Sequence, residues 1–139
     1  MHAKFLRAQE LSREIIGAGI EVHRILGPGL LESIYEKCLQ HELELRGYRV
    51  VRQQTVQINY KGFAFVDELR FDLLVEDCVL VELKAVQEVH PIEKAKLLSY
   101  MKLLNVPLGL LINFHEVRLV DGVSRMILRD ASTEEFEEV

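Results

Sequence analysis

The stretch RFDLLVEDCVLVELKA, residues 70–85, constrains the fold more than any other part of the chain. It contains two runs of strand-like apolar residues, separated by a polar Glu-Asp turn, and both runs carry charged residues. Side chains alternate between the two faces of a strand, and here the odd-numbered positions of both runs form all-apolar rows. Burial of both rows on one face of a sheet predicts an antiparallel pair in which odd positions face odd positions.

This register places charged residues opposite one another. If Val75 faces Val79 across a three-residue loop, Asp72 faces Glu82, and Lys84 follows two residues later on the same face. Directly opposed side chains have Cβ atoms about 5 Å apart, and like charges in that arrangement are destabilising. Two carboxylates so close need either a shared proton or a cation between them.

A divalent metal ion meets this need. Mg²⁺ binds in proteins through one or two carboxylates together with waters and phosphate oxygens, so Asp72 and Glu82 are predicted ligands for Mg²⁺ or Mn²⁺. The ammonium group of Lys84 would then orient an attacking water or stabilise charge on a phosphate. The pattern indicates a phosphodiesterase site. Spacing alone also allows a solvated strand face with a weak ion pair between Glu82 and Lys84.

The rest of the chain predicts an α/β fold in the order helix, helix, three strands, helix, two strands. Apolar periodicity and strong helix formers predict helices over residues 4–26, 30–46 and 91–105. Alternating or continuous apolar runs predict strands over residues 55–60, 63–75, 79–86 and 108–114. Asp121-Gly122 predicts a hairpin turn at the end of the fold. Ser132 and Glu135 form a capping-box pattern in the acidic tail, residues 130–139.

Composition narrows the classes of protein to which the chain can belong. Its 139 residues contain no repeat or linker, which fits one domain with a hydrophobic core. Cys38 and Cys78 lack the spacing of a disulfide framework or a zinc site, so we expect them to be small core side chains. No apolar run could cross a membrane and no signal peptide is recognisable, which predicts a cytoplasmic protein. A net charge of −5 argues against holding nucleic acid by bulk electrostatics.

Several segments, in order along the chain, resemble the GxxExxY proteins of the PD-(D/E)XK nuclease superfamily. Gly29-x-x-Glu32-x-x-Tyr35 resembles the sequence signature for which these proteins are named. The resemblance covers about residues 10–128 and continues through VHRILGPGLLESIYEKCL, QINYKG, FDLLVED, VELKAV, LLSYMKLL and GLLINF. It implies a restriction-endonuclease-like core, a mixed β-sheet flanked by helices, and this agrees with the element order predicted from the residues.

The resemblance also implies roles for four acidic or basic residues. Asp72 and Glu82 would be metal ligands, and Lys84 would be the catalytic lysine. Glu32, carried by a helix, would complete the metal site or hold a water there. All four are therefore candidate catalytic residues.

Substrate-binding candidates lie near these four. Similar proteins carry a Gln-x-x-x-Tyr arrangement on the helix after the third strand, which here reads Lys96-x-x-x-Tyr100. Lys96 and Tyr100 share one helical face, and Lys96 could contact phosphate in place of the glutamine. Arg70 shares the strand face of Asp72 and could also touch a phosphate, although a structural ion pair is the commoner role of such an arginine. Phe71 stands where the superfamily has a nominal proline.

Together these features predict a metal-dependent nuclease that hydrolyses phosphodiester bonds in nucleic acid, with DNA as the preferred substrate. One alternative is a catalytically inactive nuclease-fold protein that binds nucleic acid or a protein partner, with Lys84 or Lys96 between the carboxylates in place of a metal. Another is a structural or oligomeric interaction module whose charges point to open solvent. A domain this small, with little positive charge, is expected to need a protein partner or a homo-oligomer to hold its substrate.

Overall fold

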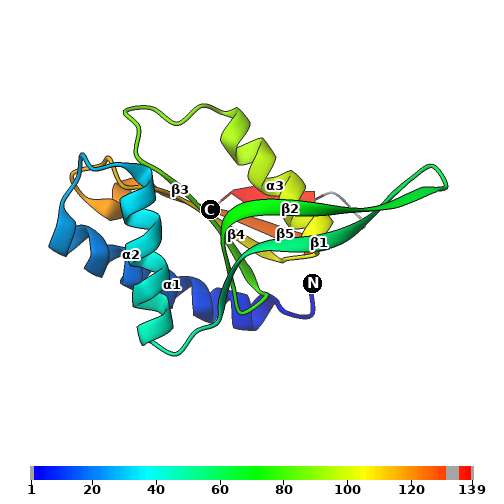
Figure 1. Cartoon of the computed structure of the whole chain (residues 1–139), viewed down its shortest axis with the longest axis horizontal. Helices are drawn as coiled ribbons and strands as arrows, with labels where there is room; N and C mark the ends of the chain where they lie inside the picture. The colour runs from blue at the N-terminus through cyan, green and yellow to red at the C-terminus, as the bar shows by residue number, and fades with distance from the viewer. Residues whose placement is uncertain (1, 131–134, 139) are drawn as a thin grey trace.

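The computed structural model describes residues 2–130 and 135–138. Its helices and strands are α1 (Phe5–Leu26), α2 (Glu32–Leu45), β1 (Val50–Tyr60), β2 (Phe63–Val75), β3 (Val79–Lys84), α3 (Ile92–Leu104), β4 (Leu108–Asn113), β5 (Val123–Asp130) and β6 (Glu135–Glu138). The strands form one mixed sheet in the order β1-β2-β3-β4-β5-β6 (Figure 1). The pair β3–β4 is parallel and the other neighbours are antiparallel. The predicted α/β class and element order are confirmed.

Helices cover both faces of the central strands. One buried cluster of side chains joins α1 and α2 to one face of the sheet. A second, which we call the α3 cluster, joins α3 to the other face. Alternation along β3 sends Val81 and Leu83 into the first cluster and Leu80 into the second. Both faces of β3 are therefore covered. Glu82, one of its two charged residues, is only 5% exposed.

The helix α3 approaches β4 closely at Gly109. A Cβ at this position would lie 2.6 Å from the sulfur of Met101 and 3.1 Å from Leu97, both on α3. The missing side chain lets the helix lie directly on the strand. This contact fixes the height of α3 above the sheet, and with it the side chains that α3 carries toward β3.

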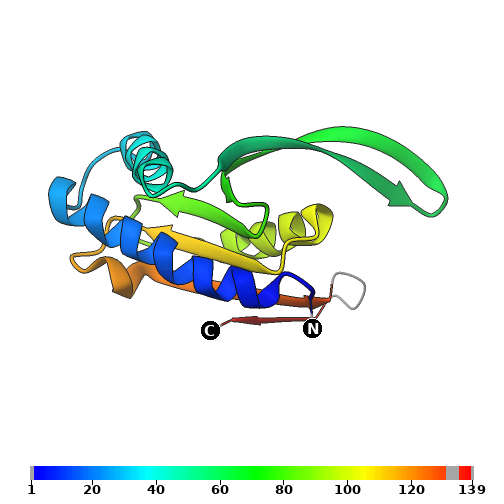
Figure 2. The same ribbon diagram turned by 90° about the horizontal axis from the view of Figure 1, so that it is seen from below.

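The strands β1 and β2 continue past the rest of the sheet as a long two-stranded hairpin (Figure 2). It turns at Lys61-Gly62, where both residues have positive φ angles of 48° and 85°, as the turn predicted there requires. Near its base the hairpin packs on the α3 cluster through Val56. At its tip the rings of Phe63 and Phe65 stack with centroids 5.1 Å apart, and Phe63 is 63% exposed.

The connection from β4 to β5 differs from the prediction. Leu119–Gly122 forms a 3-10 turn, so Asp121-Gly122 ends a helical turn and does not make a two-residue hairpin. The buried side chain of Leu119 packs so close to α1 that a Cβ on Gly19 would meet it at 3.0 Å. Packing against α1, which no local pattern reveals, determines this turn.

Some element ends also differ from the prediction. The strand β1 begins at Val50, earlier than residue 55, and β3 ends at Lys84, before residue 86. Glu135 of the predicted capping box begins the strand β6, while Ser132 lies outside the described residues. The extension of β1 was missed because residues 52–54 are polar and do not alternate with apolar ones.

Two expectations from composition can be compared with the structure. Cys78 is a buried core residue and Cys38 is partly buried against the same cluster, and both are free thiols. No helix within the described part of the chain is long and apolar enough to span a membrane.

Candidate active site

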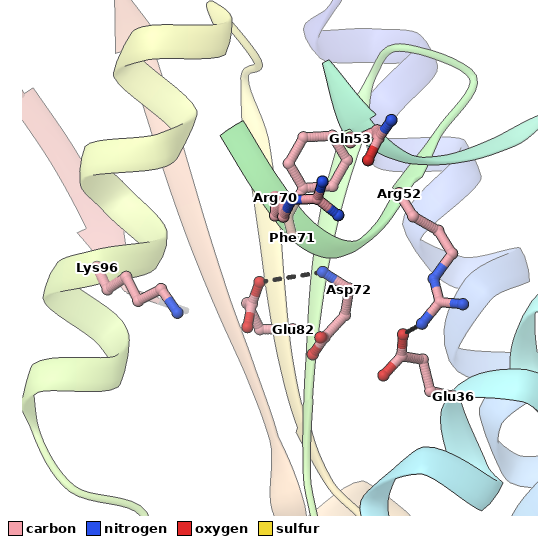
Figure 3. Close-up of a pocket in the computed structure, with 8 residues that line it drawn as sticks. All are labelled: Glu36, Arg52, Gln53, Arg70, Phe71, Asp72, Glu82 and Lys96. Carbon is pink, nitrogen blue, oxygen red and sulfur yellow. Dashed lines mark hydrogen bonds and ion pairs between the residues drawn. The ribbon is translucent and has the colours of Figure 1, made fainter. Parts of the chain in front are cut away.

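The strand β2 separates from β3 at Asp72. The backbone ladder between them pairs Val75 with Val79, which confirms the register predicted from side-chain parity. Beyond the ladder, the Leu83 N–H donates to the Asp72 carboxylate at 2.8 Å, and the Asp72 N–H donates to Glu82 at a longer 3.4 Å (Figure 3). Each carboxylate thus accepts a backbone N–H of the opposite strand. These bonds hold both carboxylates side by side where the sheet opens.

The carboxyl group of Glu82 is strongly perturbed. Burial, followed by the nearby charge of Asp72, raises the pKa of Glu82 to about 7. Such a pKa is the expected response of two opposed carboxylates without a cation, because a proton relieves their repulsion. A cation between the two carboxylates would relieve the same repulsion.

The helix α2 brings two further carboxylates to Asp72. Glu32 is its first residue and Glu36 follows one turn later on the same face. Carboxylate oxygens of Glu32, Glu36 and Asp72 all lie within 4.8 Å of one another, close enough to bind one metal ion. Burial raises the pKa of Glu32 in spite of the opposing effect of Lys84. A set of hard oxygen donors such as this suits Mg²⁺ or Mn²⁺.

The position of Glu32 depends on the tyrosine of the Gly-x-x-Glu-x-x-Tyr pattern. Tyr35 is buried, and its hydroxyl donates to the Gly27 carbonyl at 2.6 Å and accepts the Leu30 N–H at 3.0 Å. Its ring stacks on Phe114 with centroids 4.5 Å apart. Tyr35 therefore ties the loop before α2 to the core and fixes where Glu32 enters the site.

Lys84, at the end of β3, forms an ion pair with Glu93 in the first turn of α3, with 3.2 Å between Nζ and Oε2. Burial lowers its pKa, but the bond to Glu93 and the charges of Glu32 and Glu82 outweigh burial and raise it. Lys84 is therefore a cation at neutral pH. It can stabilise negative charge, and it is poorly suited to accept a proton from water.

A cavity of about 580 Å³ opens beside the paired carboxylates (Figure 3). Its lining is rich in charged side chains and comes from five elements: Glu36, Arg52, Gln53, Arg70, Phe71, Asp72, Glu82 and Lys96. Lys96 extends its ammonium group from α3 toward the carboxylates (Figure 3). The cavity places cationic side chains around the carboxylates of Asp72 and Glu82. This arrangement suits a phosphate group together with a metal ion.

The substrate-binding candidates are placed differently from one another. Lys96 and Arg70 both line the cavity, although Arg70 is 79% exposed and pairs with Glu68 at 3.1 Å. Tyr100 does not line it; its ring packs against the α3 cluster, with the Lys96 ammonium 5.6 Å from the ring centre. Lys96 and Tyr100 are neighbours on α3, as expected, but only Lys96 reaches the cavity.

Sequence reasoning missed three residues that the structure brings to the site. Glu36 could have been found from its spacing of four residues after Glu32. Glu93 could not, because its partner Lys84 lies on another element. Arg52 forms an ion pair with Glu36, drawn in Figure 3, and only the three-dimensional pairing of β1 and β2 reveals it.

The site carries an excess of negative charge. Arg70 is already paired with Glu68; when the remaining groups are all ionised, five carboxylates face three cationic side chains, which leaves two negative charges uncompensated. The groups are Glu32, Glu36, Asp72, Glu82 and Glu93 against Arg52, Lys84 and Lys96. One divalent cation would balance this excess.

A mixed sheet flanked by helices, with paired carboxylates where two central strands separate, defines a nuclease-like α/β protein. A family model described as the PD-(D/E)XK nuclease superfamily matches residues 9–126, most of the chain. The chain therefore belongs to the PD-(D/E)XK nuclease superfamily. Divalent metal ions are typical of these nucleases, and nucleic acid is the substrate that membership implies. No curated protein and no solved structure matches the chain.

Proposed function

We propose that this protein is a Mg²⁺- or Mn²⁺-dependent nuclease that hydrolyses phosphodiester bonds of DNA. The observation that carries the proposal is the pair Asp72–Glu82, held side by side where β2 leaves β3 and open to a charged cavity. Two carboxylates this close, one of them buried, repel each other unless a proton or a cation lies between them. The motif Gly29-x-x-Glu32-x-x-Tyr35 supports a place among the GxxExxY proteins, and we expect the cytoplasm as its location.

The residues of the site would have different roles in hydrolysis. Asp72 would hold the metal ion together with the α2 carboxylates Glu32 and Glu36, which converge on it. Glu82, which accepts the Asp72 N–H, would be the further ligand expected from the sequence. When bound, the ion supplies Lewis-acid stabilisation of the phosphate and of the leaving oxygen. Lys84, kept protonated and oriented by Glu93, stabilises charge that develops on the phosphate as water attacks in line.

The basic residues of the cavity would bind the backbone of the substrate. Lys96 and Arg70 approach the carboxylates from different elements, α3 and β2, so they can contact successive phosphates. With a net charge of −5 the chain offers few other phosphate contacts, which supports the need for a protein partner or a second copy.

A catalytically inactive nuclease-fold protein remains the second candidate, and Lys96 in place of glutamine favours it. The arrangement expected for it places Lys84 or Lys96 between the carboxylates. Lys84 pairs with Glu93 instead, whereas Lys96 extends from α3 toward Glu82 and Asp72, which supports this candidate. An interaction module with fully solvated charges fits less well, since Glu82 is buried.

Calorimetry with Mn²⁺ and Mg²⁺, beside cleavage assays on duplex DNA, single-stranded DNA and RNA, tests the proposal. Asp72→Asn removes one charge but keeps an oxygen for the Leu83 N–H. We expect it to weaken metal binding at least about tenfold and to abolish cleavage. The matched control Asp67→Asn removes the same charge from the same strand outside the cavity, and it should behave as wild type.

The outcomes separate the candidates. Equal metal affinity in Asp72→Asn and wild type would refute the proposed metal site. Metal binding without cleavage of any of the three substrates would favour the inactive nuclease-fold protein. In an active enzyme, Lys84→Met should retain metal binding and lose cleavage, because its role is to stabilise charge on the substrate.

A further inference from the structure

Arg52 stands at an irregularity in the β1–β2 ladder. Val51 pairs with Leu74 and Gln53 pairs with Arg70, so the single residue Arg52 faces three residues of β2, 71–73. Asp72 is the middle one of these three. Ladder irregularities of this kind redirect side chains and occur next to active sites. Here the irregularity brings one arginine to the metal-binding carboxylates.

The guanidinium group of Arg52 already has an acidic partner. Its Nη2 forms an ion pair with Oε1 of Glu36 on α2 (Figure 3). The two side chains differ in freedom, since that of Glu36 is 11% exposed and that of Arg52 is 49% exposed. The acid is therefore held by its surroundings, while the arginine reaches it from the cavity and can leave it.

Glu36 is also one of the three carboxylates that converge within 4.8 Å, with Glu32 and Asp72. Without a metal ion, the positive charge of Arg52 partly neutralises this cluster. A divalent ion bound by the same oxygens would supply more charge at shorter distance and would repel the guanidinium. Arg52 and the ion therefore compete for Glu36.

The released arginine would lie beside the substrate. Arg52 lines the cavity together with Lys96 and Arg70, and a planar guanidinium group can donate two parallel hydrogen bonds to a phosphate. We propose that Arg52 is an exchangeable counter-ion: it pairs with Glu36 in the metal-free protein, and metal binding releases it to bind the substrate phosphate. This inference depends on the proposed nuclease function.

The consequence is a coupling between metal and nucleic acid. The metal ion makes Arg52 available, so DNA binds more tightly after the metal, and by reciprocity DNA tightens metal binding. The protein would therefore bind DNA weakly until a metal ion occupies the carboxylate site.

Calorimetry with Mn²⁺ alone tests the competition directly. Arg52→Gln removes the competitor, so Mn²⁺ should bind about fivefold more tightly than to wild type. The control Arg46→Gln breaks ion pairs with Glu42, which is also on α2, and with Glu14, both outside the cavity, and it should leave Mn²⁺ affinity unchanged. Glu36→Gln should weaken Mn²⁺ binding, because it removes a ligand.

Fluorescence anisotropy of a labelled DNA duplex tests the coupling. Ca²⁺, which binds the same hard oxygen ligands, replaces Mn²⁺ to limit cleavage. Wild type should bind DNA more tightly with Ca²⁺ than with EDTA beyond the general effect of the salt. Arg52→Gln should show a clearly smaller gain, because only the ion's own contact with phosphate remains. Arg52→Lys keeps the charge but lacks the planar group, so it should retain near-wild-type Mn²⁺ affinity and lose most of the gain; it also serves if Arg52→Gln does not fold.

The outcomes distinguish this inference from the proposed function. If wild type binds no metal, the proposed function fails. If wild type binds Mn²⁺ and Asp72→Asn does not, but a folded Arg52→Gln binds Mn²⁺ as wild type or more weakly, only the inference is overturned. Arg52 would then be a structural tie between β1 and α2.

Discussion

The carboxyl group of Glu82 links ionisation to folding. It is nearly inaccessible to water and lies beside Asp72, so its pKa rises to about 7 from an ordinary value of 4.5. Its proton is bound more tightly in the folded than in the unfolded protein. The resulting stabilisation is complete below pH 4.5 and disappears as the pH rises through about 7.

We therefore expect the metal-free protein to lose about 3 kcal/mol of unfolding free energy from this group between pH 4.5 and pH 8, at 1.36 kcal/mol per pKa unit. Urea unfolding in EDTA at several pH values, wild type beside Glu82→Gln, measures it. The variant cannot ionise there, so its unfolding free energy should depend less on pH over this range. Parallel pH profiles for the two proteins would show that Glu82 does not carry the effect.

Among the single residues of the site, the opposed carboxylates could be predicted from the sequence, whereas some of the charged residues beside them could not. Asp72 and Glu82 follow from the parity of two apolar rows, since burial permits one register only. Arg52 could not be predicted, because its position depends on where the β1–β2 ladder shifts. Glu93 depends in the same way on how α3 lies over β3.

Among the elements, α3 packs directly on the sheet. Gly109 on β4 leaves no room for a Cβ beneath Met101 and Leu97. The same helix carries Glu93 and Lys96 into the site, so its distance from the sheet matters to both. The helices and the strands β2, β3 and β4 were predicted to within two residues at each end, because helices and strands have different apolar periods. The 3-10 turn at Leu119–Gly122 was not, because tertiary packing overrides local turn preference there.

Gly109→Ala is expected to destabilise the protein by about 1–3 kcal/mol, the usual cost of overpacking a core. Chemical denaturation with Mg²⁺ absent measures this effect. Gly17→Ala on α1 is the matched control, because its Cβ would meet only an arginine side chain at an ordinary 3.5 Å and alanine favours a helix. An unchanged stability for Gly109→Ala would mean that α3 can move away from β4 at little cost.

For the whole molecule, metal binding and folding should be coupled. The carboxylates that converge come from α2, which carries Glu32 and Glu36, and from β2, which carries Asp72, elements that meet only in the folded chain. An ion that binds them therefore stabilises the native state by mass action. The element order and layers could be predicted from the sequence, but the projection of the β1–β2 hairpin could not, since strand alternation is the same inside and beyond a sheet.

At a hundredfold excess of free Mg²⁺ over its dissociation constant, the unfolding free energy should rise by about 2.7 kcal/mol and Tm by about 10 °C. Thermal scans at matched ionic strength, with KCl as the comparison, measure the increase. Asp72→Asn should show little of it, and Asp67→Asn should show all of it. A rise of equal size in Asp72→Asn would place the stabilising ion elsewhere.

The strand β2 runs without interruption from Phe63 at the exposed tip to Val75 in the core. About nine residues, or roughly 30 Å at 3.3 Å each, separate Phe63 from Asp72. Next to Asp72, Phe71 is buried against the α3 cluster. The hairpin tip and the carboxylate of Asp72 therefore belong to one continuous strand. A ligand that touched both would have to follow the strand for about nine residues, so a polymer could make both contacts and a small molecule confined to the cavity could not.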